Sequence, residues 1–159
     1  MMVRTVGDDA PEQKVIDDIA TYGWHCVGIH AEGDESPFAF TVGLFQTFGH
    51  PEFIIFGLAS KVAHQILGLA VNAIRSGAPL DLSLPTDQLL EGYPCCFVRV
   101  PESQYHEHVG FAVWYYRGDS FPLYQIVFPS RDGHFPWHPE ATASFRDFQP
   151  VLGRPQLGA

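Results

Sequence analysis

An almost uninterrupted apolar segment, Glu52–Leu58, constrains the fold of this chain more than any other feature. A short apolar run bounded by turn formers is typical of a strand that is buried on both faces. A second apolar segment, Phe38–Leu44, precedes it, and the Gly and Pro residues of Thr47–Pro51 predict a connection rather than a helix between the two. The two segments therefore predict the central strands of a sheet.

Three further strands and three helices complete the predicted secondary structure. Strand composition marks three more segments, Trp24–His30, Tyr93–Val100 and Leu123–Phe128. Apolar residues at helical spacing, together with capping residues and terminal glycines, predict helices that run from Asp9 to Gly23, from Ser60 to Gly77 and from Tyr105 to Gly118.

This order of elements indicates the fold class. The short connection between the two apolar strands favours antiparallel pairing, whereas the helical crossovers permit parallel pairing. We therefore expect an α+β fold with three helices and about five strands, mostly antiparallel, in a curled sheet or a partly closed barrel. The 159 residues fit a single domain. We expect residues 1–10 to be flexible and residues 129–159, rich in turn formers, to wrap irregularly over the core.

Composition excludes several classes of function. With 9 Lys and Arg against 18 Asp and Glu, the formal charge is −9, which argues against a nucleic-acid partner. No apolar stretch approaches the roughly 20 residues that span a bilayer, so we expect no membrane association. The chain begins without a basic, apolar leader and has an odd number of cysteines, which predicts a cytoplasmic protein with reduced thiols at Cys26, Cys95 and Cys96.

The segment Gly49–Glu52 holds the candidate catalytic residues, since it places an imidazole and a carboxylate at a tight turn before a central strand. In the functional interpretation, His50 is a general base or a polar ligand contact, and the charge of Glu52 raises its basicity. In the structural interpretation, Pro51 fixes the backbone and Glu52 caps a free N–H group. Both interpretations stay open at this point.

Three residues are candidates for cofactor binding. Thr41 and Gly43 lie inside an apolar strand, where a glycine indicates close approach by a ligand, a bulge or a barrel corner. Trp137, between Pro136 and His138, is expected on the rim of a pocket. Because aromatic residues make up 14% of the chain, they are numerous enough to build a flat apolar pocket for an aromatic or heterocyclic molecule.

Eight histidines raise the question of a metal site, because imidazole is the commonest metal ligand in proteins. His134 and His138 are close enough in a loop to converge, and His30 lies near two acidic residues at a strand end. The alternative is that these histidines are ordinary surface or hydrogen-bonding residues. No phosphate-binding loop or nucleophile elbow is present in the sequence, and enzymatic activity stays open.

Several motifs together carry a family resemblance: Tyr22-Gly-Trp24, Phe38–Leu44, Gly49-His-Pro-Glu52, Gln125–Pro129, Asp132–Trp137 and Gln149–Leu152. With these motifs the chain resembles the bacterial family called "domain of unknown function 4262" over nearly its whole length. The resemblance implies a bacterial protein and brings no established reaction or catalytic residue. A looser, fold-level similarity links Phe40–Leu44 and Pro51–Ile55 to flavin-binding split barrels, which would make flavin a candidate cofactor.

Three functional hypotheses follow. The first is a small-molecule binding protein whose aromatic or heterocyclic ligand lies in a pocket of the curled sheet near His50, Glu52 and Trp137. The second is a non-catalytic interaction module of the immunity or regulatory type, whose negative charge meets a basic partner. The third is a metal-dependent enzyme that uses His30, His134 or His138. The formation of a homodimer is compatible with each of them.

Overall fold

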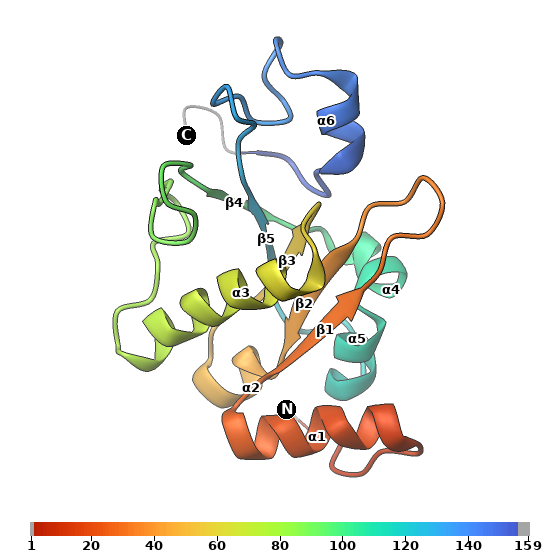
Figure 1. Ribbon diagram of the computed structural model, residues 1–159. Helices are drawn as coiled ribbons and strands as arrows, with labels where there is room; N and C mark the ends of the chain where they lie inside the picture. The colour runs from red at the N-terminus through yellow and green to blue at the C-terminus, as the bar shows by residue number, and fades with distance from the viewer. Residues whose placement is uncertain (1, 156–159) are drawn as a thin grey trace.

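A computed structural model describes residues 2–155, which form an α+β fold around one five-stranded sheet (Figure 1). The strand order is β1-β2-β3-β5-β4. The strands are β1 (His25–Ile29), β2 (Phe38–Val42), β3 (Glu52–Phe56), β4 (Cys96–Arg99) and β5 (Leu123–Val127). Two predicted segments are described only in part. Residue 1 of the expected flexible segment 1–10 and residues 156–159 of the expected C-terminal wrap 129–159 lie outside the described residues.

The sheet is mixed and open, which corrects the expected mostly antiparallel, partly closed barrel. β1 pairs with β2, β2 with β3 and β4 with β5 in antiparallel fashion, but the central pair, β3 and β5, is parallel. The chain between β3 and β5 contains α3, the antiparallel strand β4, and then α4 and α5, so it is long enough to allow the parallel pairing. β1 and β4 are the two edges and do not meet.

The described residues contain six α-helices rather than the expected three. They are α1 (Ala10–Tyr22), α2 (Leu44–Phe48), α3 (Ser60–Arg75), α4 (Tyr105–His108), α5 (Gly110–Tyr116) and α6 (Ala143–Phe148), and a 3₁₀ turn, η1 (Glu102–Gln104), precedes α4. The expected helix from Tyr105 to Gly118 is divided at Val109, whose φ of −120° and ψ of 49° leave the helical region. α2 and α6 have five and six residues, too few for a helical period to show in the sequence.

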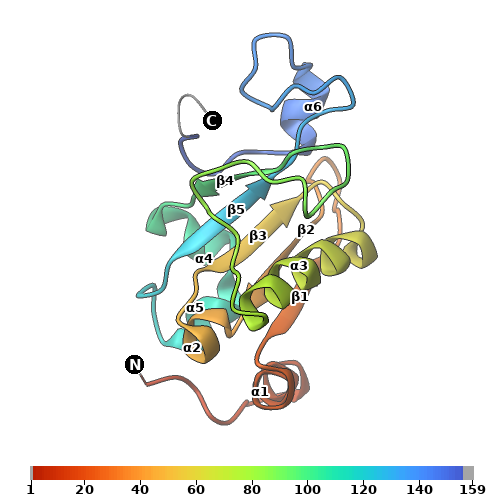
Figure 2. The ribbon, with the colours of Figure 1, turned by 90° about the vertical axis from the view of Figure 1, so that its left-hand side faces the viewer.

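Helices cover both faces of the sheet, as Figure 2 shows with α3 on the near side and α4 and α5 behind. α3 packs its buried stripe on one face of the sheet, against Ala39, Phe53, Ile55 and Ile126. The opposite face packs against α1, α4 and α5, which bury Val15, Ile19, Tyr105, Ala112 and Tyr116. Burial on both faces confirms that the apolar strands β2 and β3 are central.

The predicted start and end of the first helix are confirmed. The carboxylate of Asp9 accepts a hydrogen bond from the backbone N–H of Glu12 at 2.9 Å, so it caps the first turn. Gly23 ends α1 in the left-handed conformation, with φ of 86°.

Two fully buried glutamines attach the C-terminal segment to the sheet. The amide of Gln149 accepts from the N–H of Phe128 at 3.0 Å and donates to the carbonyl of the same residue at 2.8 Å. Gln125, within β5, donates to the carbonyl of Pro150 at 2.7 Å and accepts from the N–H of Leu152 at 2.9 Å. Because each buried glutamine side chain pairs with one backbone donor and one backbone acceptor, α6 and the chain after it are fixed against β5.

None of the helices in residues 2–155 is long and apolar enough to cross a membrane.

Candidate functional site

Glu52, the first residue of β3, lies fully buried under the N-terminus of α2. Its carboxylate accepts from the Thr41 hydroxyl at 2.7 Å and from the Tyr116 hydroxyl. It also accepts from three consecutive backbone N–H groups at 3.1–3.2 Å, those of Gly43, Leu44 and Phe45. These N–H groups are the free donors of the first helical turn, so Glu52 does from another element what an N-cap residue does locally.

The burial of Glu52 has opposing effects on its charge. Desolvation raises the pKa of the Glu52 carboxyl above its usual range, whereas the hydrogen bonds from Tyr116, Thr41 and the backbone act to lower the pKa. Thr41 is as fully buried as Glu52, and its hydroxyl also accepts from the N–H of Phe53 at 2.9 Å. A ligand therefore reaches neither side chain unless the core opens.

His50 points to a different set of atoms from Glu52. Its Nδ1–H donates to the carbonyl of Pro51 at 2.8 Å, and its ring lies 5.3 Å from the ring of Phe53. Desolvation lowers the pKa of His50, and the hydrogen bond to Pro51 opposes this shift. The donors that surround Glu52 in the structure do not include His50. The sequence neighbours proposed as a catalytic pair are thus oriented apart.

The position of Gly43 in the sequence indicated close approach by another group. In the structure, that group is another segment of the same chain. The φ angle of Gly43 is 111°, and a Cβ atom there would lie 2.9 Å from Cγ1 of Ile19 and 3.1 Å from the carbonyl oxygen of Gly23. Gly43 is the residue before α2, where the strand turns into the helix. The contact with α1 accounts for this glycine.

Trp137 lies far along the chain from Thr41 and Gly43, in the loop that follows β5. Its ring stacks on Phe135 with centroids 5.0 Å apart and packs against Cys96, Val98 and Val127. It lines a small pocket of about 330 Å³ with residues of the C-terminal segment. The three predicted cofactor-binding residues therefore occupy different elements, and Trp137 alone is on a pocket wall described here.

The cysteines do not provide a nucleophile. Burial raises the pKa of Cys26 to about 11 and the pKa values of Cys95 and Cys96 to about 12. All three are free thiols. Because the thiolate is the reactive form, these raised pKa values disfavour reaction of the cysteines near neutral pH.

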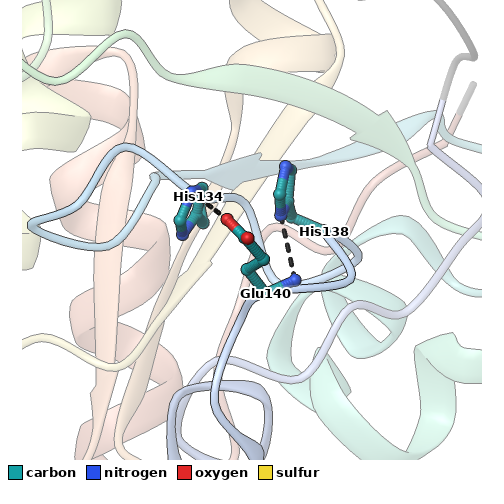
Figure 3. Close-up of side chains that lie close together, drawn as sticks. All are labelled: His134, His138 and Glu140. Carbon is teal, nitrogen blue, oxygen red and sulfur yellow. Dashed lines mark hydrogen bonds and ion pairs between the residues drawn. The ribbon is translucent and has the colours of Figure 1, made fainter.

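The loop after β5 brings His134 and His138 together with a third residue, Glu140 (Figure 3). The imidazole centroids lie 4.2 Å apart with an angle of 14° between the ring planes. Nε2 of His134 lies 3.4 Å from Oε2 of Glu140. Among the described residues this is the one group of three His, Cys, Asp or Glu side chains with the spacing of metal ligands, and the exposed His30 is not part of it.

The sequence predicted the two histidines and missed Glu140. A spacing of i, i+4 and i+6 matches neither a helix nor a strand, so periodicity could not select the carboxylate. The turns Ser130–Gly133 and Phe135–His138 bring the three side chains to one side of the loop. The only available signal was the concentration of His, Pro and Gly in this part of the chain.

A pocket of about 480 Å³ lies beside this cluster, between the carboxyl end of β5, α6 and the loop before β4. Aromatic rings form much of its wall, and two members of the cluster reach it; these lining residues are Tyr93, Phe128, Phe145, Phe148, His134 and Glu140. A pocket that is mostly apolar and has a few converging polar groups is the usual form of a small-molecule site.

Comparison with known families identifies the family of the chain. The family model with the description "Domain of unknown function (DUF4262)" matches residues 18–142. The protein therefore belongs to this family, which confirms the resemblance found in the sequence motifs. The match includes His134, His138 and Glu140 and ends before α6. Neither a curated protein nor a solved structure matches this chain.

Proposed function

We propose that the protein binds a small aromatic or heterocyclic molecule in the pocket beside α6. The observation that carries this proposal is the pocket itself, whose volume of about 480 Å³ lies in the range of small-molecule sites, roughly 300–1,000 Å³. The rings of Tyr93, Phe145 and Phe148 offer flat apolar contacts, while His134 and Glu140 offer polar ones on the same wall.

The position of the pocket supports the proposal. It lies outside the carboxyl end of β5, which runs parallel to β3, and ligands of α/β sheets commonly bind at the carboxyl ends of parallel strands. The buried amide of Gln149 fixes the end of α6 to Phe128, so the aromatic wall is attached to the sheet. A binding surface built on such a support needs little ordering when a ligand enters.

The experiment begins with native mass spectrometry of the freshly purified protein, beside its denatured mass, to detect a bound molecule. The second step is a titration with flavin mononucleotide and with a set of aromatic and heterocyclic fragments, in which backbone amide chemical shifts report binding. We expect shifts in residues 128–145. Because the Tyr93 ring forms part of the wall, Tyr93→Ala should weaken binding about tenfold or more, which corresponds to roughly 1.4 kcal/mol.

Tyr22→Ala is the matched control, because Tyr22 is 59% exposed and lines a different pocket near Lys14 and His25. It should leave the fragment affinity unchanged. Chemical shift changes centred on the pocket near Lys14 and His25, or no binding of any fragment, would contradict the proposal.

The charge of −9 favours a second candidate, a non-catalytic module that binds a basic protein. Association with such a partner should weaken steeply as salt is raised, because exposed charges are screened. Binding to a basic partner that is insensitive to salt between about 0.05 and 0.5 M would count against this candidate.

A further inference from the structure

The cluster of His134, His138 and Glu140 has the ligand types of a transition-metal site. One ligand atom from each side chain lies within 4.8 Å of the others. Two imidazoles and one carboxylate are a set that zinc and non-haem iron sites use, with further coordination positions left for water or substrate. Figure 3 shows the carboxylate of Glu140 directed toward the ring of His134, while the backbone nitrogen of Glu140 faces the ring of His138.

The distance between His134 and Glu140 is that of a long ion pair and also fits two ligands of one metal ion. Charge-assisted hydrogen bonds between nitrogen and a carboxylate are about 2.7–2.9 Å long. Nε2 of His134 and Oε2 of Glu140 are 3.4 Å apart. Two ligand atoms that each lie about 2.0–2.1 Å from a tetrahedral zinc ion are roughly 3.3 Å apart, which is close to the observed separation.

Nδ1 of His138 is engaged with the backbone of Glu140. It accepts a hydrogen bond from the backbone N–H of Glu140 at 3.0 Å, which uses the one in-plane lone pair of this nitrogen. A metal bound at Nδ1 would take the place of this hydrogen bond. Neutral imidazole is the form that binds metals.

Hydrogen bonds hold the loop in this conformation. Ser130 pairs with His134 through its N–H at 2.8 Å and its hydroxyl at 3.2 Å. Arg146 of α6 donates to the carbonyl groups of Pro136 and His138, each at 2.9 Å. Binding of an ion would need movements of the three side chains, including exchange of the His138–Glu140 hydrogen bond for the ion, on a loop that is already supported, which lowers the ordering cost of binding.

We propose that His134, His138 and Glu140 bind a divalent transition-metal ion, zinc in the first place, at the wall of the pocket beside α6. His134 and Glu140 belong to the cluster and also line the pocket, so an ion bound by them would lie at the pocket wall and could present an open coordination position to it. Glu140 is 73% exposed, which allows the ion to enter from solvent. The role of that open position, to bind a polar group of the pocket ligand, rests on the proposed function; metal binding itself does not.

The test uses the full chain, freed of metal with a chelator, in an isothermal titration with Zn²⁺ alone. We expect one ion per chain. Each of His134→Ala, His138→Ala and Glu140→Gln should lower the affinity for Zn²⁺ by about tenfold or more, because each removes one ligand. His30→Ala and His106→Ala are the matched controls, since both remove exposed histidines outside the cluster and should leave the affinity unchanged.

A second readout separates a built site from loose surface binding. Visible absorption of Co²⁺ added in place of zinc reports the number and geometry of its ligands, and the three cluster variants should alter this spectrum. Thermal unfolding of each variant without metal establishes that it folds. Zinc binding that is absent, or that His134→Ala and His106→Ala weaken equally, would overturn the proposal.

The two proposals fail in different ways. If Zn²⁺ binds through the cluster and fragments do not shift residues 128–145, the metal site stands and the pocket function is wrong. If fragments bind there and Zn²⁺ does not bind, the metal site is wrong and the pocket function stands. If both bind, fragment titrations with and without Zn²⁺ measure whether the ion contributes to ligand affinity.

Discussion

The hydroxyl of Tyr116 in α5 donates a hydrogen bond to the carboxylate of Glu52 in β3, 64 residues earlier in the chain. The same hydroxyl accepts from the N–H of Gln46 in α2 at 3.2 Å. Glu52 accepts from three further N–H groups of the α2 start, so a strand and two helices meet at one buried carboxylate. This arrangement gives the short helix α2 the capping that its own sequence lacks, since Gly43 provides no side-chain cap.

Glu52→Gln should destabilise the fold although it preserves size. Every partner of the carboxylate is a donor, so an amide NH₂ group would face N–H groups and leave buried donors unpaired. We expect a loss of about 2–4 kcal/mol in the free energy of unfolding, because unpaired buried polar groups cost about 1–3 kcal/mol each. Urea unfolding followed by circular dichroism measures the loss.

Tyr116→Phe should have a smaller effect, because the ring remains packed while one donor to Glu52 is lost. We expect a loss of roughly 1–2 kcal/mol. Tyr22→Phe, on the exposed face of α1, is the control and should be neutral. If Glu52→Gln and Tyr116→Phe are both as stable as the natural chain, the carboxylate does not support α2.

His50 should make stability depend on pH. Desolvation lowers the pKa of folded His50 below its usual 6.5, so the unfolded chain binds the proton more readily. The stabilising contribution is complete above pH 6.5 and is lost as pH falls through the interval down to the folded-state pKa. Urea titrations from pH 7.5 to 5 should therefore show a decline in stability that His50→Asn reduces.

His106→Asn is the control for this pH series, because His106 is exposed. This variant should show nearly the same pH dependence of stability as the natural chain. An equal reduction by the two variants would mean that His50 is not the group responsible.

Gln149→Ala should release the C-terminal segment. Its removal leaves the buried N–H and C=O of Phe128 without partners, at a cost of about 2–4 kcal/mol. Hydrogen exchange measured by mass spectrometry should show faster exchange across residues 143–152 before the sheet opens. The exposed Gln88→Ala should show no change, and uniform exchange in both variants would refute the anchoring role of Gln149.

Gly153→Ala should also destabilise the attachment of this segment. A Cβ at Gly153 would overlap the carbonyl oxygen of Arg99 and approach Cγ1 of Val98 to 3.1 Å. We expect a loss of at least about 1–3 kcal/mol, the usual cost of forced overpacking. By contrast, Gly68→Ala in α3 has open space around its Cβ and should stabilise the protein by about 0.5–1 kcal/mol. Thermal unfolding of the two variants should thus shift in opposite directions.

The sequence predicted most of the regular secondary structure of the fold. All five strands, the first helix and α3 follow from apolar runs and helical spacing that persist over four or more residues, because burial favours such patterns. β2 and β3 are central as expected. The helix expected from Tyr105 to Gly118 was divided at Val109, since a periodic stripe does not reveal a local break in the backbone.

The candidate sites show where local patterns stop being informative. Glu52 and His50 are two residues apart, yet one side chain enters the core and the other contacts Pro51. Gly43 and Trp137 looked alike as ligand contacts, yet Gly43 faces Ile19 of α1 and only Trp137 lies on a pocket wall. Such differences depend on which distant segments of the chain pack against each residue.

The sequence by itself determined the apolar core, the strands and longer helices, the charge and the family, because these depend on residue type and short-range spacing. Tertiary structure decided the parallel pairing of β3 with β5, the capping of α2 by Glu52, and the grouping of Glu140 with His134 and His138. Each of these features depends on contacts between residues that no helical or strand period relates in the sequence. Their geometry is set by the packing of the whole chain.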